Sequence, residues 1–192
     1  MTDTKTEALL WIDTETTAVN PSDGQLLEVG LMLTDMTGTT IEPIRAWTIR
    51  HDSISFTPRT EYAIYLHTRN GLIDESFTHG TDSTHAARTI LETLTRYADQ
   101  HRLHPAGTNV DFDLDWIESK LDLDTDMLDY HKLDLTPLRM LIRQTHPEPH
   151  THQPTRHRVA ECLQRDVSEY KTILDTITKA LADDQREGSP EQ

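Results

Sequence analysis

Hydrophobic residues form two short continuous runs near the start of the chain, at 8–13 and 26–34, and a turn-rich segment at 19–24 separates them. Continuous apolar runs of this length are typical of buried strands, so we predict a hairpin of two neighbouring strands. A third strand is expected at 41–50. It should lie near an edge of the sheet, because Pro43 has no amide hydrogen to donate to a neighbouring strand.

Apolar residues take on helical spacing in the second half of the chain. The pattern predicts a helix over 83–100 with Ser83 as its N-cap, and a short strand at 105–110 that leads into a helix at 112–121. The remaining predicted elements are a strand at 132–135, a helix at 136–144, a loop rich in Pro and His at 145–155 and a helix at 157–182. Strands first and mixed strand–helix units later indicate an α/β domain with a partly antiparallel sheet.

The 192 residues contain no linker long enough to separate two domains, so we expect a single domain over 1–182 followed by a polar tail at 183–192. The longest apolar runs are far shorter than the roughly 20 residues that cross a bilayer, which excludes a helical membrane protein. Cys162 is the one cysteine, so no internal disulfide can form. Because a single thiol suits a reducing compartment and no export signal is evident, we expect a cytoplasmic protein.

The charge of the chain narrows the range of partners. There are 33 Asp and Glu residues against 18 Lys and Arg residues, which gives a formal net charge of −15 at pH 7. A surface of this sign repels a polyanion, so long duplex nucleic acid is not expected as a ligand. A short strand escapes this exclusion, because few of its phosphates meet the acidic surface and divalent cations reverse the local charge.

Acidic residues and a histidine stand at the ends of several predicted elements. Asp13 and Glu15 end the first strand two residues apart, so the strand period places both side chains on one face. Such a pair is unfavourable unless both acids are solvated or a cation binds between them. Asn109 and Asp113 lie at a strand-to-helix junction, and His157 begins the last helix. Three carboxylates and an imidazole are the groups required for two-metal phosphodiester hydrolysis.

These motifs resemble those of the DEDDh 3′-to-5′ exonucleases, and among them the oligoribonuclease family, from about residue 9 to residue 170. The matching segments are Trp11-Ile12-Asp13-Thr14-Glu15-Thr16-Thr17, Leu27-Glu28-Val29-Gly30, Tyr62 with the segment 67–72, Asn109-x-x-Phe112-Asp113, Leu133-Asp134-Leu135-Thr136 and His157-Arg158. The resemblance implies a ribonuclease H-like fold, with a mixed five-stranded sheet flanked by helices. It also implies a homodimer, two divalent cations (Mg²⁺ or Mn²⁺), and release of 5′-mononucleotides from short single-stranded RNA.

The resemblance also implies roles for individual residues. It assigns catalysis to Asp13, Glu15, Asp113 and His157, the three carboxylates as metal ligands and the histidine as general base. The substrate-binding residues that it implies are Thr16, Thr17, Val19, Tyr62, Asn109 and His131. In that set Tyr62 stacks on a base, Val19 takes the place of an apolar wedge, and His131 or Lys132 meets a substrate phosphate.

One position departs from the family pattern. The family has an Asp five residues after the catalytic His, and Cys162 stands there in this chain. A thiol is a soft ligand, whereas Mg²⁺ prefers hard oxygen. Cys162 also lies within the apolar stripe of the last helix, which predicts a buried and unreactive thiol.

Three interpretations of this departure remain open. Glu161 supplies the missing carboxylate, which we favour; Asp166, one turn further along the helix, acts through a water; or the site no longer catalyses. The function is accordingly a metal-dependent exoribonuclease, an exonuclease that acts on short single-stranded DNA, or an impaired module that binds short nucleotides or a protein partner.

Overall fold

A mixed sheet forms the centre of the computed structural model, which describes residues 5–145 and 155–187. Its five strands have the order β3-β2-β1-β4-β5, so that β1 lies in the middle. The strands are β1 (Thr6–Thr16), β2 (Leu26–Thr34), β3 (Thr40–Thr48), β4 (His101–Gly107) and β5 (Leu133–Asp134). β2 pairs antiparallel with both β1 and β3, while β4 pairs parallel with β1 and β5. The predicted hairpin and the edge position of the strand that contains Pro43 are both confirmed.

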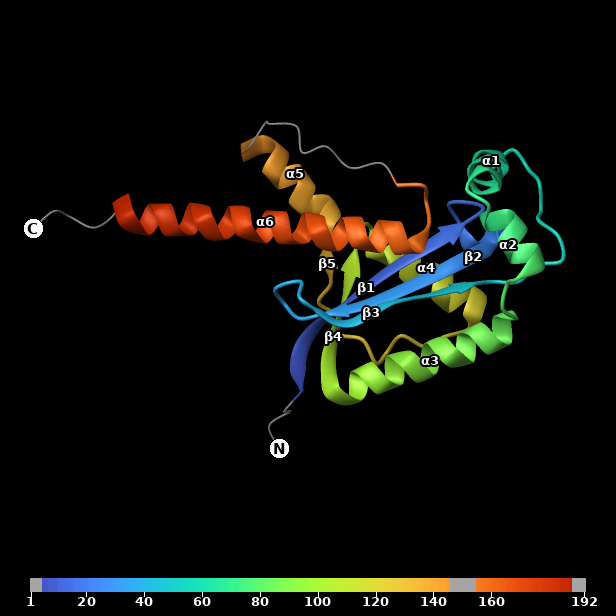
Figure 1. Ribbon diagram of the computed structural model, residues 1–192, viewed down its shortest axis with the longest axis horizontal. Coiled ribbons are helices and arrows are strands. Elements are labelled where there is room, and N and C mark those ends of the chain that lie inside the picture. Colours follow the sequence, from blue (N-terminus) through green and yellow to red (C-terminus); the bar gives the residue numbers. More distant parts are fainter. Residues whose placement is uncertain (1–4, 146–154, 188–192) are drawn as a thin grey trace, which may run out of the picture.

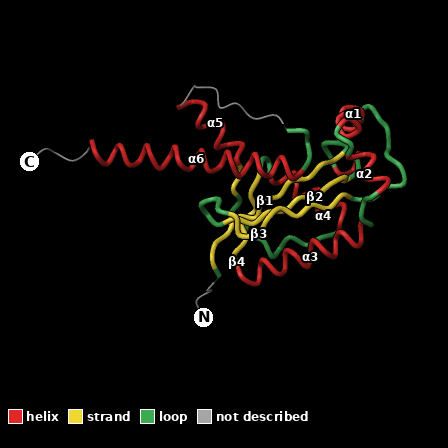
Figure 2. Tube along the Cα trace, in the orientation of Figure 1, coloured by secondary structure: helices red, strands yellow, loops and turns green. Residues whose placement is uncertain are grey.

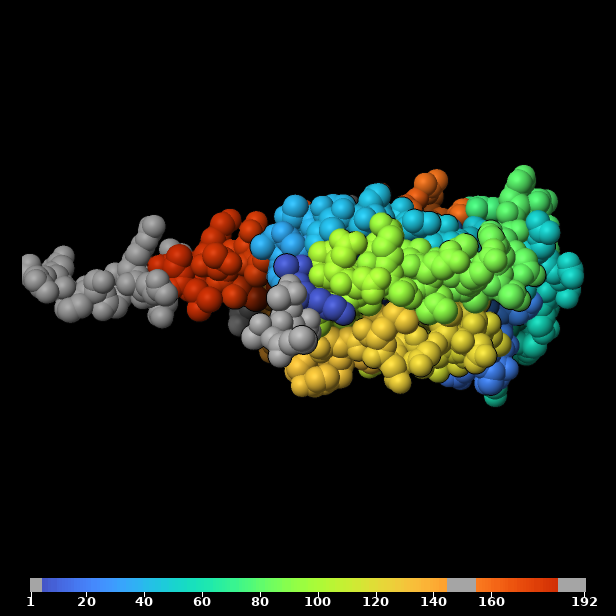
Figure 3. Space-filling model, turned by 90° about the horizontal axis from the view of Figure 1, so that it is seen from below, coloured from blue at the N-terminus to red at the C-terminus, as the bar shows by residue number. Residues whose placement is uncertain are grey.

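Helices cover both faces of this sheet (Figures 1 and 2). They are α1 (Glu61–Arg69), α2 (Leu72–Thr78), α3 (Ser83–Gln100), α4 (Val110–Leu121), α5 (Leu135–Thr145) and α6 (Val159–Glu187), together with a short 3-10 turn, η1 (Pro21–Asp23). Helices α3 and α4 lie below the sheet and α5 and α6 above it, while α1 and α2 stand beside the end of β1 (Figure 1). Seen from below, α3 and α4 cover the sheet and the end of α6 projects beyond the body of the molecule (Figure 3).

The residues of β1 divide between two hydrophobic layers according to the strand period of two. Leu10 and Ile12 pack with residues of α3 and α4, whereas Leu9 and Trp11 pack with residues of α5 and α6. The same alternation places Asp13 on the side of Leu9 and Trp11. The carboxylates at the end of β1 therefore face α6.

Gly30 on β2 lets α6 approach the sheet closely. A Cβ atom at this position would lie 2.7 Å from Cβ of Val159 and 2.9 Å from Cδ1 of Leu163, too close for two carbon atoms. Gly30 is also the partner of Asp13 in the β1–β2 ladder. The start of α6 is thus held directly over the part of β1 that carries the acidic residues.

Several predicted boundaries differ from the structure. The N-cap of α3 is Asp82, whose carboxylate accepts hydrogen bonds from two backbone amides, and Ser83 is already helical. The strand predicted at 105–110 occupies His101–Gly107, because the chain turns into α4 at Val110. Helix α6 continues to Glu187, into the segment predicted as a polar tail.

Two helices, α1 and α2, were not predicted, and most of the loop predicted at 145–155 lies outside the described residues. Within the part of the chain that the structure describes, none of the helices combines the length and the apolar character required to cross a bilayer.

Candidate active site

The site lies where two parallel strands separate at their carboxyl ends. Pairing between β1 and β4 ends at Trp11 and Ala106, two residues before Asp13. Beyond this point β1 remains paired with β2 only, and the chain after β4 turns into α4. Open α/β sheets bind their ligands at such places, because the strand ends and the following helices deliver side chains to one position.

Two carboxylates of β1 and the thiol of α6 meet at this point. One ligand atom from each of Asp13, Glu15 and Cys162 lies within 4.8 Å of the other two. Glu15 is 7% exposed and Cys162 4% exposed, and the thiol donates a hydrogen bond of 3.7 Å to Oε1 of Glu15. Oδ2 of Asp13 is buried and has no hydrogen-bond partner among the described residues. The prediction that the two acids share one face of the strand is confirmed.

A third carboxylate, that of Asp113, enters from the first turn of α4. Its Oδ1 atom accepts two hydrogen bonds from Thr14, at 2.8 Å from the backbone amide and at 2.7 Å from the hydroxyl. Asp113 is 3% exposed, although it is an acid. Thr14 stands between the two acids of β1 in sequence, so these bonds tie α4 to the same stretch of strand.

Burial and mutual repulsion hold these carboxylates away from their ordinary ionisation. Burial, followed by the charges of Asp113 and Glu15, raises the pKa of Asp13 well above its usual value. Burial and the charge of Glu28 raise the pKa of Glu15 to about 8. Burial also raises the pKa of Asp113 to about 7, against the lowering effect of the Thr14 hydrogen bonds. A bound divalent cation would offset the free-energy cost of ionising these carboxyl groups so close together, and carboxylate oxygens are suitable ligands for Mg²⁺ or Mn²⁺.

A buried histidine on α1 lies against the acids. Nε2 of His67 is 3.6 Å from Oε2 of Glu15, and both side chains are buried. Burial lowers the pKa of His67 to about 4, so the imidazole is neutral at pH 7 and forms a polar contact with Glu15 rather than an ion pair. His67 belongs to the segment 67–72, which places α1 beside the end of β1.

The loop before α6 presents His157 on the surface of this site. His157 has a left-handed backbone conformation with φ of 56°, which residues other than glycine rarely adopt. Asn70 stabilises it, because its amide nitrogen donates hydrogen bonds of 2.8 Å to the carbonyl oxygens of both Arg156 and His157. The charge of His157 also lowers the pKa of His67, less than burial does.

Partly buried ion pairs of Arg158 attach the start of α6 to β2 and α2. Arg158 donates to both oxygens of Glu28 on β2, at 2.7 and 3.0 Å, and to Glu75 on α2 at 2.8 Å. The backbone amide of Val159 donates to Glu28 as well, at 3.1 Å. Together these bonds fix the segment that carries His157.

The structure does not bring Glu161 to the acidic cluster, contrary to the interpretation that this residue replaces the missing carboxylate. Adjacent residues of a helix point in different directions, and the Glu161 carboxylate accepts hydrogen bonds from the side chain and the backbone amide of Arg156, at 2.7 and 2.9 Å. This pairing lowers the pKa of Glu161 below its usual value.

Asp166 is buried closer to the cluster than its place in the sequence suggested. Its carboxylate accepts hydrogen bonds from Thr108 at 2.7 Å and from Arg165 at 2.8 Å, and a longer one from Arg139 at 3.4 Å. Its charge contributes to the raised pKa of Asp113. Asp166 is therefore a fourth acid of this region, although it is not in the group of three residues whose ligand atoms converge.

Val19 and Tyr62, two of the implied substrate-binding residues, are both 76% exposed. Thr16 and Thr17 are instead buried and bond to nearby backbone atoms, the former to the carbonyl of Ala18 and the latter to the amide of Gln25. The other residues that the resemblance assigned to substrate binding pair with acidic side chains. The backbone amide of Asn109 donates to Asp134, His131 pairs with Asp129, and Lys132 pairs with Asp111.

Sequence reasoning missed Thr14, His67 and Asn70 as parts of this site. The segment 67–72 was recognised, but its buried His67 and its Asn70 contact Glu15 and the loop of His157 in ways that only the folded chain reveals.

Several curated proteins with similar sequences are named oligoribonuclease, although no protein-family model matches the chain. The chain is 27% identical over 179 residues to the oligoribonuclease of Leifsonia xyli subsp. xyli, which covers 92% of this chain and 85% of that protein. It is 24% identical over 173 residues to the oligoribonuclease of Mycobacterium leprae, which covers 86% of this chain and 79% of that protein.

Solved structures of Exonuclease I share the fold. One of them, E. coli Exonuclease I in complex with a 5cy-dT13 oligonucleotide, matches with a TM-score of 0.67 at 14% identity and covers 91% of this chain and 44% of that chain. A second matches with a TM-score of 0.67 at 16% identity and covers 88% of this chain and 41% of that chain. The chain thus spans less than half the length of these exonucleases. The ribonuclease H-like fold is confirmed, and the chain is distantly similar in sequence to proteins named oligoribonuclease.

Proposed function

We propose that this protein is a metal-dependent 3′-to-5′ exonuclease that hydrolyses short oligoribonucleotides to 5′-mononucleotides. The observation that carries the proposal is the meeting of the half-buried Asp13 and the buried Glu15 of β1 with the buried Asp113 of α4, whose charges act on one another. Placing three acids together inside a protein destabilises the fold unless a bound cation compensates for their charge. We therefore infer that these acids bind a cation and do not stabilise the fold by themselves.

Asp13, Glu15 and Asp113 are the residues that would hold two divalent cations, Mg²⁺ or Mn²⁺. When bound, these cations supply Lewis acidity towards the scissile phosphate and its attacking water. Thr14 fixes the orientation of the Asp113 carboxylate through its two hydrogen bonds. His67, neutral and buried against Glu15, excludes water from that side of the site.

His157 is the proposed proton acceptor. The residue is exposed, and the backbone that carries it is fixed by the two Asn70 hydrogen bonds. Histidine is the side chain that most often accepts a proton in general base catalysis. Replacing His157 by Ala should therefore lower turnover by ~10²–10⁴-fold and leave metal binding intact.

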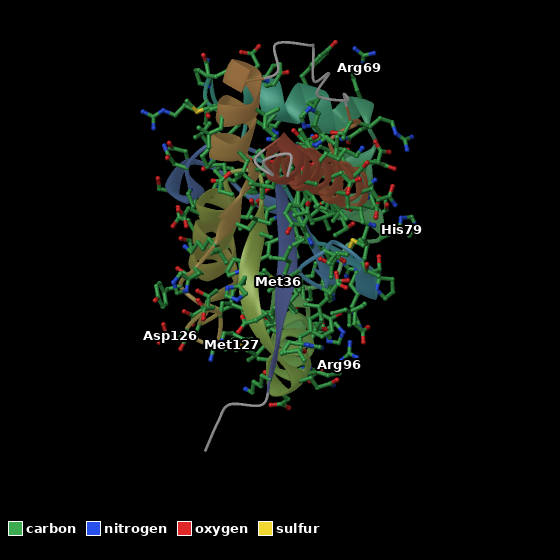
Figure 4. The ribbon with its side chains drawn as sticks, turned by 90° about the vertical axis from the view of Figure 1, so that its left-hand side faces the viewer. Met36, Arg69, His79, Arg96, Asp126 and Met127 are labelled. Atoms are coloured by element: carbon green, nitrogen blue, oxygen red, sulfur yellow. The ribbon has the colours of Figure 1, made fainter. Side chains whose placement is uncertain are left out.

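The preference for short substrates follows from charge. The net charge of −15 repels each phosphate that lies outside the site. An open cavity of about 670 Å³ has several acids in its lining, Asp126 among them. Figure 4 shows Asp126 at the lower left and Arg69 of α1 at the upper right. The exposed rings of Tyr62 and Tyr65, which also belong to α1, offer stacking surfaces for bases. RNA is favoured over DNA because the curated relatives are named oligoribonucleases.

A homodimer is part of the proposal. Met140 and Leu141 on α5 and Ile177 and Leu181 on α6 are exposed apolar side chains. Exposed apolar side chains favour burial against another copy of the chain. Light scattering at micromolar concentration should give twice the mass of the chain.

The experiment that tests the activity incubates the purified protein with a labelled diribonucleotide and Mg²⁺ or Mn²⁺. The wild type should release mononucleotides, and Asp113→Asn should not. Asp115→Asn is the matched control, because Asp115 is an exposed acid on the same helix, and it should retain full activity. Equal release by all three proteins would indicate a contaminating nuclease and contradict the proposal.

Two further substrates define the class. A DNA dinucleotide of the same sequence should be cleaved more slowly than the diribonucleotide, and a thirty-nucleotide RNA should be cleaved more slowly per molecule at low salt. Faster cleavage of the DNA would assign the protein to short single-stranded DNA. Binding of the diribonucleotide without cleavage under either metal would identify an impaired binding module.

A further inference from the structure

The only cysteine of the chain lies against the acids and not among the apolar residues of α6. Leu163 and Val167 of the same helix pack in the layer beneath α6. Sγ of Cys162 is turned instead towards Asp13 and Glu15, within 4.8 Å of a carboxylate oxygen of each. The stripe position that predicted an unreactive thiol thus places a sulfur atom among metal-binding groups.

The donor set is two carboxylates and one thiol. Three protein ligands around one cation, with a further position left for water or substrate, is the arrangement of catalytic zinc sites. Mg²⁺ by contrast requires near-octahedral oxygen and is poorly served by sulfur. Oδ2 of Asp13 independently indicates a ligand, because it is buried in the site with no hydrogen-bond partner among the described residues.

We propose that Asp13, Glu15 and Cys162 form a mixed carboxylate–thiolate site that selects a borderline cation, Zn²⁺ or Co²⁺, over Mg²⁺. The inference rests on the proposed function, since it concerns one of the two cations of that active site. The metal–sulfur bond forms as the thiol releases its proton to solvent, and nothing is oxidised or reduced.

A neighbouring side chain supports coordination by sulfur. Oγ1 of Thr155 lies 3.3 Å from Sγ of Cys162 and can donate a hydrogen bond to it, which would orient the sulfur. The backbone amide of His157 in turn donates to Thr155 at 3.3 Å. The sulfur is therefore connected through a single hydroxyl to the loop that carries the proposed general base.

Cobalt provides a direct test, because a bond between Co²⁺ and a thiolate gives a charge-transfer band in the near ultraviolet. The full chain, without affinity tag, is titrated with Co²⁺ at neutral pH. Since Cys162 is the only cysteine, the band reports this residue alone, whereas Co²⁺ bound to histidines gives no such band. We expect the band to saturate at one equivalent, to persist in excess Mg²⁺ and to vanish on adding one equivalent of Zn²⁺.

Variants identify the other ligands. Cys162→Ser should fold, as circular dichroism would show, and lose the band. Glu15→Gln should weaken Co²⁺ binding by about 10–100-fold. Glu161→Gln is the matched control, because the Glu161 carboxylate pairs with Arg156, and it should leave the titration unchanged. No band in the wild type, or equal affinities in Glu15→Gln and the wild type, would overturn the inference.

Calorimetry gives a second measurement on the same proteins. Cys162→Ser should lower the affinity for Zn²⁺ by at least about 10-fold and leave the affinity for Mg²⁺ unchanged. Equal losses for both cations would overturn the selectivity. Cleavage of the diribonucleotide by a protein that shows no cobalt band would leave the proposed function standing and refute this site. A cobalt band in a protein without nuclease activity would support this metal site and refute the proposed function.

Discussion

Replacing Glu15 by Gln should make the metal-free protein less sensitive to alkaline pH. Burial and the charge of Glu28 raise the pKa of Glu15 from 4.5 to about 8 in the folded state. The unfolded chain restores the ordinary value, so the folded state binds this proton more tightly. The stability that the protonated carboxyl contributes is fully present below about pH 4.5 and is lost as the pH rises through about 8.

The size of the effect follows from the two pKa values. Between pH values of about 6.5 and 8.5, linkage gives a loss of roughly 2 kcal/mol in the free energy of unfolding from this one group. The Gln variant cannot ionise and lacks this loss. Asp113, whose pKa is raised to about 7, changes stability in the same direction, but it is present in both proteins and its contribution largely cancels in the comparison.

Urea unfolding, followed by tryptophan fluorescence in the presence of a chelator, measures the difference. The lower pH limit is set by His67, whose pKa of about 4 makes the folded state lose stability as the pH falls below the ordinary value of 6.5. Glu92→Gln, an exposed acid on α3, serves as the control and should follow the wild type.

The wild type should lose roughly 2 kcal/mol more than Glu15→Gln across this pH interval. Added Mn²⁺ should restore the stability of the wild type at the higher pH more than that of the variant, because the cation replaces the proton. If wild type and variant lose the same stability, the carboxyl of Glu15 is not held protonated by its surroundings and the reasoning fails.

Three other changes test the packing, the loop and the substrate surface. Gly30→Ala should cost about 1–3 kcal/mol of unfolding free energy, because its Cβ would overlap Val159; an unchanged melting temperature would contradict the close approach of α6. Asn70→Ala should lower kcat by about 10–100-fold with little change in KM, because His157 loses its backbone support; a change confined to KM would argue against it. Tyr62→Ala should weaken diribonucleotide binding by ~1–3 kcal/mol per stacked base while Tyr62→Phe binds normally, as equilibrium titration would show; equal binding by both variants would remove the stacking role.

Local periodicity was sufficient to predict the acidic half of the site. Asp13 and Glu15 had to share a face because a strand alternates its side chains, and Asp113 had to stand at a helix start because its segment followed a strand. These relations involve neighbours in sequence and do not depend on how distant elements pack.

The remaining residues of the site, His67 and Cys162, owe their positions to the packing of elements that are distant in sequence. His67 is the one buried residue of α1 and the others are half-buried or exposed, so no apolar stripe in that segment indicated that His67 would reach Glu15. The stripe of α6 showed which residues of the helix are buried, but not which of them lies over the sheet and which over the end of β1. That distinction separates Leu163, in the core, from Cys162, in the site.

The central position of β1 has a consequence for the timescale on which the site holds its shape. β1 is hydrogen-bonded on both sides up to Trp11, directly before the acids. Amides in such a strand exchange with solvent only when the whole domain opens, whereas segments at helix ends open with less free energy. The loop of His157, held by side-chain bonds from Asn70, should exchange first. In native-state hydrogen exchange the amides around the carboxylates of β1 should therefore exchange slowly and those of the His157 loop quickly, so that His157 leaves and returns many times while the carboxylates keep their mutual positions.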